Sequence, residues 1–349
     1  MSVTSWKLKI RRAGAIMAAL ATVGSLSACG GTGTPKGAAT SSGGKRVYTV
    51  GFMPKTTADP FFVAADDGAK QAARELGMKL VYNGPATIDA AAQSQLIGQW
   101  TQEHLDAITV SANDPNALVP AMKQAVQAGV KVSTWNADVA APGREFFMDN
   151  PTPQMLAHTL VTQVTASTGP KAKVLLITST FTAPNQASWL SAIKALVAKQ
   201  YPGFDIQTVL AGQADTATSF NEAKNWLQAH PETQAILTLD GNALAGAAQA
   251  VDAVGKKGHI VVTGIGVPSQ NGPQILAGTV KSAVLWSPVD LGYAAMYMVH
   301  AQLSGAIKPG AQSSLPAGHL GKLKFITPDT ILLGSPLVFT RANVRNYHF

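Results

Sequence analysis

The run VYTVGFMPKTTADPFFVAADDGAKQAAREL, residues 47–76, decides the fold. It begins with a β-rich stretch from Val47 to Met53 and continues, after a short polar loop, with an alanine-rich helical pattern from Phe61 to Leu76. Gly77 then supplies a typical helix stop. A strand followed by a loop and a helix is the first part of a βαβ unit, and its repetition along a chain predicts a parallel sheet.

The same alternation of short β-rich runs and longer helical patterns continues through two series of about domain size. The expected strands are 47–53, 80–82, 107–111 and 130–135 in the first series, and 174–178, 206–210, 235–239 and 260–264 in the second. Helical patterns separate them, which predicts parallel sheets covered by helices on both faces. The two series share no close sequence repeat. We therefore expect an α/β protein with two similar doubly wound parallel-sheet lobes.

Composition limits the classes of protein that need to be considered. The chain has 349 residues, of which 46% are hydrophobic and 13% charged, so it is long enough for two domains with substantial cores. Its single cysteine excludes a disulfide framework, a cysteine zinc site and a thiol–disulfide motif. The seven histidines include no metal-spaced pair, and we expect neither a metal nor a cofactor.

The net charge of +8 is compatible with a nucleic-acid partner until its distribution is considered. Four of the 27 basic residues lie within residues 1–12, where there is no acidic residue. The remaining 23 basic and 19 acidic residues leave an excess of only four. We therefore expect no nucleic-acid partner.

The first 28 residues have the layout of a secretory signal peptide. A basic start precedes an apolar run from Ala13 to Leu26, which is shorter than the ~20 residues that span a bilayer. The run closes on Leu26-Ser27-Ala28-Cys29, which resembles the bacterial lipobox, whose cysteine is acylated. A plain signal peptide with a chance cysteine is the alternative. The polar residues 29–45 predict a flexible tether, so the expected location is the cell envelope, outside the cytoplasm, anchored to the cell membrane by an N-terminal lipid.

Polar and aromatic side chains follow most of the expected strands, where open α/β sheets bind their ligands. Amides both donate and accept hydrogen bonds, carboxylates accept from hydroxyls, and aromatic faces cover the apolar C–H surface of a sugar ring. The pattern predicts a site for a neutral polyhydroxyl ligand. The expected site residues are Lys55, Phe61, Phe62, Asn136, Asp138, Asn185, Gln186, Asp240, Asn242 and Trp286.

Some of these residues have a structural interpretation as well. Asp59-Pro60 is a good helix start, because Asp is a preferred N-cap and Pro suits the first turn, so Asp59 is left out of the site. One of Phe61 and Phe62 is expected in the core, since adjacent helical residues point in different directions. Lys55 has the alternative of an ordinary surface lysine.

The same applies to residues further along the chain. Asp138 is also compatible with a turn or cap. Asn242 is also compatible with a cap for a helix at Ala243, and Trp286 with packing at a hinge. Asp240 is the residue for which a ligand role is favoured most.

In their order along the chain, these residues resemble a cluster of the sugar-binding proteins of ABC importers, the one that includes ribose-, rhamnose- and autoinducer-2-binding proteins. The resemblance extends over nearly everything after the tether. The matching segments are Phe52 to Lys55, Asp59 to Phe62, Val110 to Pro115, Thr134 to Asp138, Asn185-Gln186, Trp286 to Pro288, Asp290 to Tyr293 and Phe339 to Phe349.

The resemblance implies two lobes that close on a sugar around a three-strand hinge (the periplasmic binding protein-like I fold). It places the crossings near Asp149-Asn150, near Trp286-Ser287 and around Gly318 to Lys324. The N-terminal lobe is then 46–148 with 287–318, and the C-terminal lobe is 149–286 with 319–349. It further implies a monomer that is not an enzyme and that hands its ligand to a membrane permease.

The sequence departs from the autoinducer-2 type, which has acidic residues where this chain has Asn136 and Asn185. The residues that flank Asp240 differ as well: this chain has Leu239 and Gly241 where that type has Pro and Ala. A pentose, deoxyhexose, ketose or sugar alcohol is therefore the expected ligand. The alternatives are a receptor for a sugar or an autoinducer-2-like signal and, less favoured, an exported sugar-converting enzyme in which Asp138 and Asp240 form a carboxylate pair.

Overall fold

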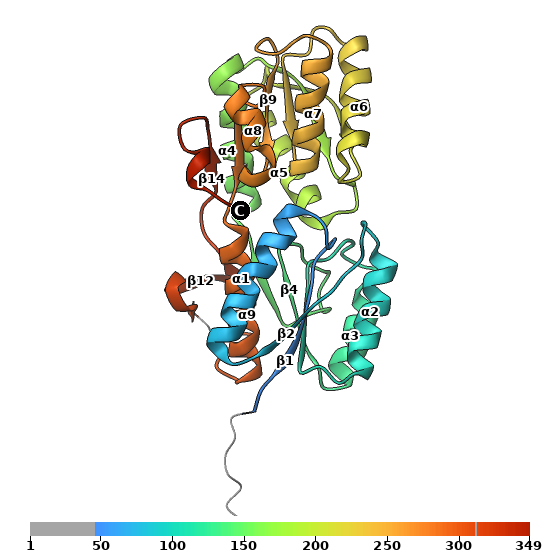
Figure 1. The fold of residues 1–349 in the computed structure, drawn as a ribbon, viewed down its shortest axis with the longest axis vertical. Helices are drawn as coiled ribbons and strands as arrows, with labels where there is room; N and C mark the ends of the chain where they lie inside the picture. Colours follow the sequence, from blue (N-terminus) through green and yellow to red (C-terminus); the bar gives the residue numbers. More distant parts are fainter. Residues whose placement is uncertain (1–45, 311–312) are drawn as a thin grey trace, which may run out of the picture. The chain divides into compact units, whose positions relative to one another are not determined.

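The computed structural model describes residues 46–310 and 313–349. The expected signal peptide, Cys29 and the tether lie outside the described residues. From Arg46 onward the chain forms two α/β lobes, each built on its own sheet (Figure 1). The expected fold class is confirmed.

The first lobe contains a sheet that is mostly parallel. Its strands are β1 (Thr49–Met53), β2 (Lys79–Tyr82), β3 (Ala107–Val110), β4 (Lys131–Trp135), β5 (Phe146–Asp149), β11 (Ser314–Pro316), β12 (Lys322–Thr327) and β13 (Thr330–Leu332). They lie in the order β11-β12-β13-β5-β4-β3-β1-β2, and only the pairs made by β12 are antiparallel. The central strands β3 and β4 are almost fully buried, as expected of a sheet covered on both faces.

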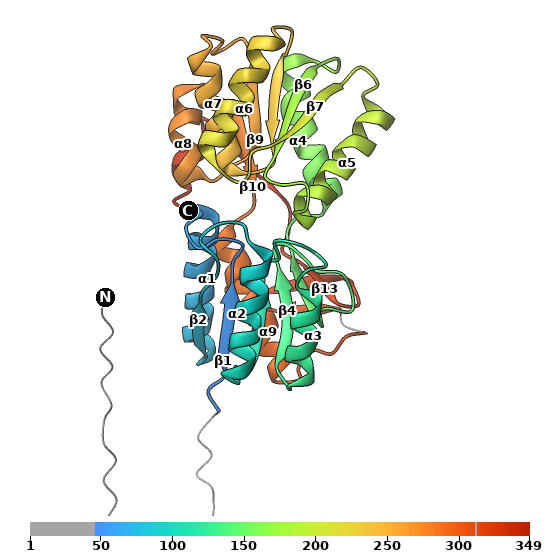
Figure 2. The same cartoon turned by 90° about the vertical axis from the view of Figure 1, so that its right-hand side faces the viewer.

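Helices cover both faces of this sheet (Figure 2). They are α1 (Pro60–Leu76), α2 (Ala90–Gln102), α3 (Val119–Gln127), α9 (Pro288–Leu303) and the short η1 (Gly318–Leu320). Helices α2 and α3 pack together on one face, and α1 packs along α9 on the other. Because α9 follows the second lobe in the sequence, the chain returns to the first lobe to complete it.

The second lobe repeats this architecture. Its strands are β6 (Lys173–Thr178), β7 (Asp205–Ala211), β8 (Ala235–Thr238), β9 (Val261–Ile265), β10 (Ser282–Leu285) and β14 (Leu337–Phe339). Its helices are α4 (Pro153–Thr168), α5 (Pro184–Gln200), α6 (Thr216–Ala229), α7 (Gly241–Ala253), α8 (Pro268–Ala277) and the short η2 (Val344–Asn346). The strand order is β14-β10-β9-β8-β6-β7, with β14 antiparallel to its neighbour.

Three segments cross between the lobes: one after β5, one between β10 and α9, and one between β13 and β14. The first and third crossings touch, because the Leu333 amide donates to the Asp149 carbonyl at 3.0 Å. The expected position of the third crossing, Gly318 to Lys324, is wrong. β12 and β13 extend the first sheet, and Thr330 to Leu332 pairs in parallel with Phe147 to Asp149. Residues up to Leu332 therefore belong to the first lobe, and the lobe boundary expected after 318 moves accordingly.

Candidate ligand-binding site

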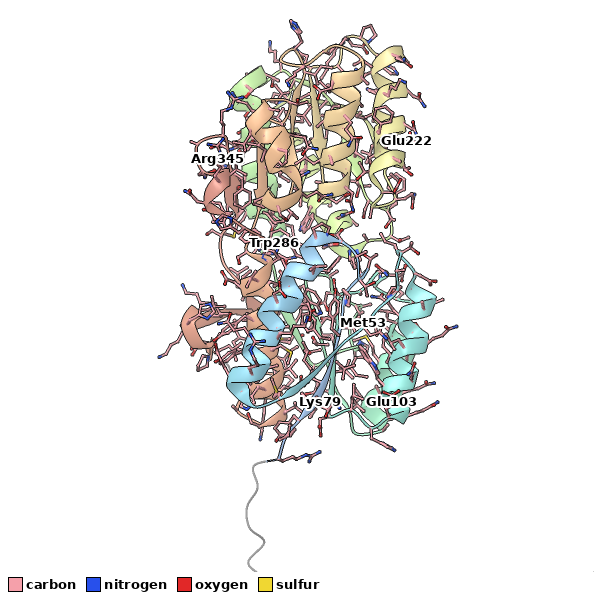
Figure 3. The ribbon with its side chains drawn as sticks, in the orientation of Figure 1. Met53, Lys79, Glu103, Glu222, Trp286 and Arg345 are labelled. Carbon is pink, nitrogen blue, oxygen red and sulfur yellow. The ribbon has the colours of Figure 1, made fainter. Side chains whose placement is uncertain are left out.

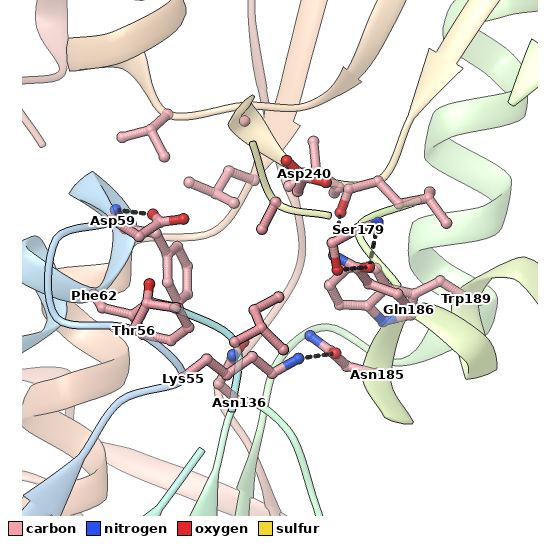
Figure 4. Close-up of a pocket in the computed structure, with 18 of the residues that line it drawn as sticks. Lys55, Thr56, Asp59, Phe62, Asn136, Ser179, Asn185, Gln186, Trp189 and Asp240 are labelled. Atoms are coloured by element: carbon pink, nitrogen blue, oxygen red, sulfur yellow. Dashed lines mark hydrogen bonds between the residues drawn. The ribbon is translucent and has the colours of Figure 1, made fainter. Parts of the chain in front are cut away.

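A cavity lies where the two lobes face each other (Figure 4). Side chains from both lobes line it, at the carboxyl ends of the strands, as open α/β sheets generally arrange their sites. Most of the expected residues meet there. They are Lys55, Phe61, Phe62, Asn136, Asn185, Gln186, Asp240 and Trp286.

Lys55 follows β1 and is buried, with 6% of its surface exposed. Its Nζ donates to Oδ1 of Asn185 at 2.8 Å, and Asn185 lies in the first turn of α5 in the other lobe (Figure 4). Desolvation lowers the pKa of Lys55 to about 7, although the nearby carboxylates of Asp240 and Asp59 oppose the shift. A lysine placed in this way can donate to a ligand oxygen and link the two lobes.

Asp240 combines the two roles that the sequence allows. It is the N-cap of α7, where Oδ1 accepts from the Ala243 amide at 2.8 Å. Its buried Oδ2 has no hydrogen-bond partner among the described residues. Desolvation raises the pKa of Asp240 to about 6. One oxygen therefore holds the helix, and the other is available to a ligand hydroxyl.

Asp59 has the same double character, which the sequence interpretation missed. Its Oδ1 accepts from the Phe61 amide at 2.9 Å and so caps α1, as expected. Its side chain also lines the cavity, where desolvation raises its pKa. The cap motif was visible in the sequence, but a cap uses only one of the two carboxylate oxygens.

The side-chain amides of Gln186 and Asn136 are held by their own lobes. In Gln186, Oε1 accepts from the Thr178 hydroxyl at 2.9 Å and Nε2 donates to the Leu239 carbonyl at 3.0 Å. In Asn136, a residue with a left-handed φ of 61°, Nδ2 donates to the Ser111 hydroxyl at 2.9 Å. The two amides thus present fixed polar groups to the cavity.

Four aromatic side chains line the cavity: Phe61, Phe62, Trp189 and Trp286. Phe61 contacts Phe62 and Trp286 edge-on, with ring centroids 5.1 and 5.8 Å apart, and Trp286 contacts Trp189 at 5.7 Å. Phe62 is the more buried of the two phenylalanines and packs edge-on against Trp135, yet both line the cavity. Trp286 lies at the junction of the lobes (Figure 3), so it both packs at the hinge and lines the cavity.

Asp138 and Asn242 do not line the cavity, contrary to expectation. Asp138 forms an ion pair with Arg144, whose Nη2 lies 2.6 Å from Oδ2, and it also accepts from the amide of Val139. The left-handed turn at Asn136 redirects the chain, so that the second residue after it faces its own lobe. Asn242 lies beside the cavity, where its Nδ2 donates to the Ala214 carbonyl at 2.9 Å.

Several lining residues were not among those expected. Trp189 lies three and four residues after Gln186 and Asn185 on α5, so the helical repeat alone placed it on the same face. Ser179 directly follows β6, a position that the strand-end rule also covers. The other lining residues are Thr56, Ile88, Ala214, Leu239, Gly241, Ile265, Val267 and Leu285.

The fold and the cavity define a two-lobed binding protein. Residues 50–307 match the family model of the periplasmic binding protein domain, and the chain belongs to this family. A sugar ABC transporter protein from Actinomyces odontolyticus is 32% identical, with a TM-score of 0.72 over 86% of this chain and 98% of its own. LsrB from Clostridium saccharobutylicum, solved with AI-2, is 27% identical, with a TM-score of 0.82 over 86% and 100%. The D-allose-binding periplasmic protein of Escherichia coli is 25% identical over 73% of this chain and 85% of its own.

The family is one of sugar-binding transport proteins, and it places the protein outside the cytoplasm. Within the part of the chain that the structure describes, none of the helices has the length and hydropathy of a membrane span.

Proposed function

We propose that the protein captures a neutral carbohydrate in the cavity between its lobes and delivers it to the membrane permease of an ABC importer. The observation that carries this proposal is the pairing of aromatic faces with fixed hydrogen-bonding groups drawn from both lobes. Sugars need both, because their rings have apolar C–H faces and hydroxyl edges. Asp240 is central, since its Oδ2 is buried without a partner among the described residues.

The charges of the cavity favour a neutral ligand. Two carboxylates, Asp59 and Asp240, stand against one lysine, Lys55, so an anionic ligand would meet unfavourable charge in a desolvated site. Asn136 and Asn185 contribute amides where the autoinducer-2 type has acids. We therefore propose a pentose, deoxyhexose, ketose or sugar alcohol as the ligand class.

A receptor for an autoinducer-2-like signal is the second candidate. It is favoured by the likeness to LsrB, which was solved with AI-2. A direct comparison of autoinducer-2 with sugars in one binding assay separates the two candidates. Recovery of the bound solute unchanged separates either of them from an exported sugar-converting enzyme.

The anchor is a separate proposal that rests on the lipobox-like segment Leu26 to Cys29. In this proposal Cys29 carries the lipid that holds the protein at the membrane, where the permease lies. Metabolic labelling with a fatty acid tests it. The wild-type chain is expected to take up label and the Cys29→Ser chain to take up none; equal labelling of both would contradict it.

A thermal-shift panel of neutral sugars and polyols tests the proposed ligand class. We expect at least one member to raise the unfolding temperature, because a ligand that binds only the folded state stabilises it by mass action. Sugar acids of matched size serve as the charge control. A panel in which no neutral member shifts the transition would contradict the proposal.

A further inference from the structure

A contact between the side chains of Asn242 and Asp59 joins the two lobes beside the cavity. Of these two residues, only Asp59 lines the cavity. Nδ2 of Asn242, at the start of α7 in the second lobe, lies 3.4 Å from Oδ2 of Asp59, which precedes α1 in the first lobe. The contact spans 183 positions of sequence and crosses the cleft. It therefore exists only while the two lobes are close together.

The Asn242 amide is oriented by its own lobe. Its Nδ2 also donates to the Ala214 carbonyl at 2.9 Å, and its Oδ1 accepts from Nε2 of Gln270 at 2.6 Å. These two bonds fix which side of the amide faces Asp59, and they do not involve the first lobe. The donor is thus positioned before the lobes meet.

The acceptor is positioned in the same way. Oδ1 of Asp59 is held by the Phe61 amide in the first turn of α1, which leaves Oδ2 to face Asn242. Donor and acceptor are therefore each held within their own lobe. Hinge opening would break the hydrogen bond between Asn242 and Asp59. It would leave intact the bonds that hold each side chain within its own lobe.

We propose that Asn242 and Asp59 form a latch that stabilises the closed arrangement of the lobes, with Asn242 acting as a positioning residue and not as a ligand contact. The latch acts without ligand, because its donor and its acceptor are both side chains of the protein. Closed lobes are the state that encloses a ligand, so the latch raises the closed fraction and with it the apparent affinity. Since Asn242 does not line the cavity, its loss weakens every ligand by the same factor.

An interlobe distance measured without ligand tests this proposal independently of the proposed function. The full chain, with Cys29→Ser, is labelled at Lys123→Cys in the first lobe and Gln228→Cys in the second, both exposed positions, and is dialysed free of solute. Energy transfer between the labels then reports open and closed populations. We expect a closed component in the unsubstituted protein and a rise of about three- to tenfold in the open-to-closed ratio with Asn242→Ala.

Two further variants sharpen the test. Asp59→Asn keeps an oxygen for the α1 cap but turns an NH2 group toward the Asn242 NH2, so it is expected to shift the ratio as Asn242→Ala does. The double variant is expected to shift it no further, because both changes remove one bond. Asn225→Ala, at an exposed position of α6, is the matched control and should leave the ratio unchanged.

The outcomes are distinct. No closed component in the unsubstituted protein, or an unchanged ratio in Asn242→Ala and Asp59→Asn, would overturn the latch, as would fully additive effects in the double variant. Thermal unfolding of each variant confirms that it folds. None of these failures would affect ligand binding by the cavity, which is measured separately.

Discussion

At the scale of single residues, the two oxygens of Asp240 have separable roles. Asp240→Asn keeps an oxygen for the α7 cap, but it removes the charge that a ligand hydroxyl would meet at Oδ2. Hydrogen bonds to a charged group contribute about 1.5–3 kcal/mol, so we expect ligand affinity to fall roughly ten- to hundredfold with little change in folding. Calorimetric titration of both proteins checks this. Equal affinities would place the ligand elsewhere, and Asp215→Asn, at the exposed cap of α6, is the matched control.

The same residue predicts how binding depends on pH. Burial raises the pKa of Asp240 to about 6 in the unliganded protein. A ligand hydroxyl that donates to the carboxylate binds the ionised form better, so protonation competes with binding. Affinity should therefore fall below about pH 6, approaching tenfold per pH unit. Titrations between pH 4.5 and 8 measure it, and stronger binding at the acid end would contradict the assignment.

Asp149, at the first hinge crossing, carries a second pH dependence, one of stability. Desolvation raises its pKa to about 7, with a further rise from Asp138 and an opposing effect of Arg144. Between the unfolded value of about 4 and pH 7 the folded chain binds more protons than the unfolded chain, so this group lowers the free energy of unfolding as pH rises. Asp149→Asn should therefore stabilise the protein more at pH 8 than at pH 5, with a difference of about 1–2 kcal/mol between the two. Urea denaturation at both values checks this, and a gain at pH 5 alone would contradict it.

The sequence predicted those site residues that lie just after the end of a strand. Lys55 and Asp240 lie two residues after the ends of β1 and β8, and both line the cavity. Asp138 fails because a left-handed residue, Asn136, intervenes, and the ion-pair partner Arg144 is recognisable only once the chain has folded. Asp59 was missed because its cap role accounted for its position without using its second oxygen.

At the scale of elements, α1 and α9 pack in direct backbone contact. A Cβ at Gly68 would lie 1.8 Å from the Val289 carbonyl oxygen, and one at Gly292 would lie 1.9 Å from that of Ala65. Gly68→Ala must therefore push the helices apart, and we expect a loss of about 1–3 kcal/mol in stability despite the higher helix propensity of alanine. Gly98→Ala on α2, where a Cβ meets nothing within 4 Å, is the control. Thermal unfolding compares them; equal effects would contradict the close packing.

Elements with a clear repeat were predictable, and those without one were not. α1 and α7 follow their alanine-rich patterns closely. α8 was missed because Gly272 and Pro273 interrupt its pattern, although the structure places the helix across both. The third crossing was placed too early by the family resemblance: β13 lies in the first sheet and β14 in the second, so the chain crosses at Gly334 to Pro336.

At the scale of the whole molecule, function depends on two sheets that present their carboxyl ends to one cavity. Neither lobe supplies the site alone: Lys55 and Asp59 come from the first and Asn185 and Asp240 from the second. Hinge closure around such a cavity would enclose the ligand and create a state that a permease can distinguish from the open one. The sequence predicted two lobes, but the contacts between them depend on tertiary structure and could not be derived from strand order.

A crystal structure of the protein with a bound neutral sugar tests whether the cavity between the lobes holds the ligand. We expect one sugar enclosed between the lobes, with hydroxyls on Oδ2 of Asp240 and on Lys55 and with a ring face against Phe61, Phe62, Trp189 or Trp286. A sugar held on the outer surface of a single lobe, with the interlobe cavity left empty, would contradict it.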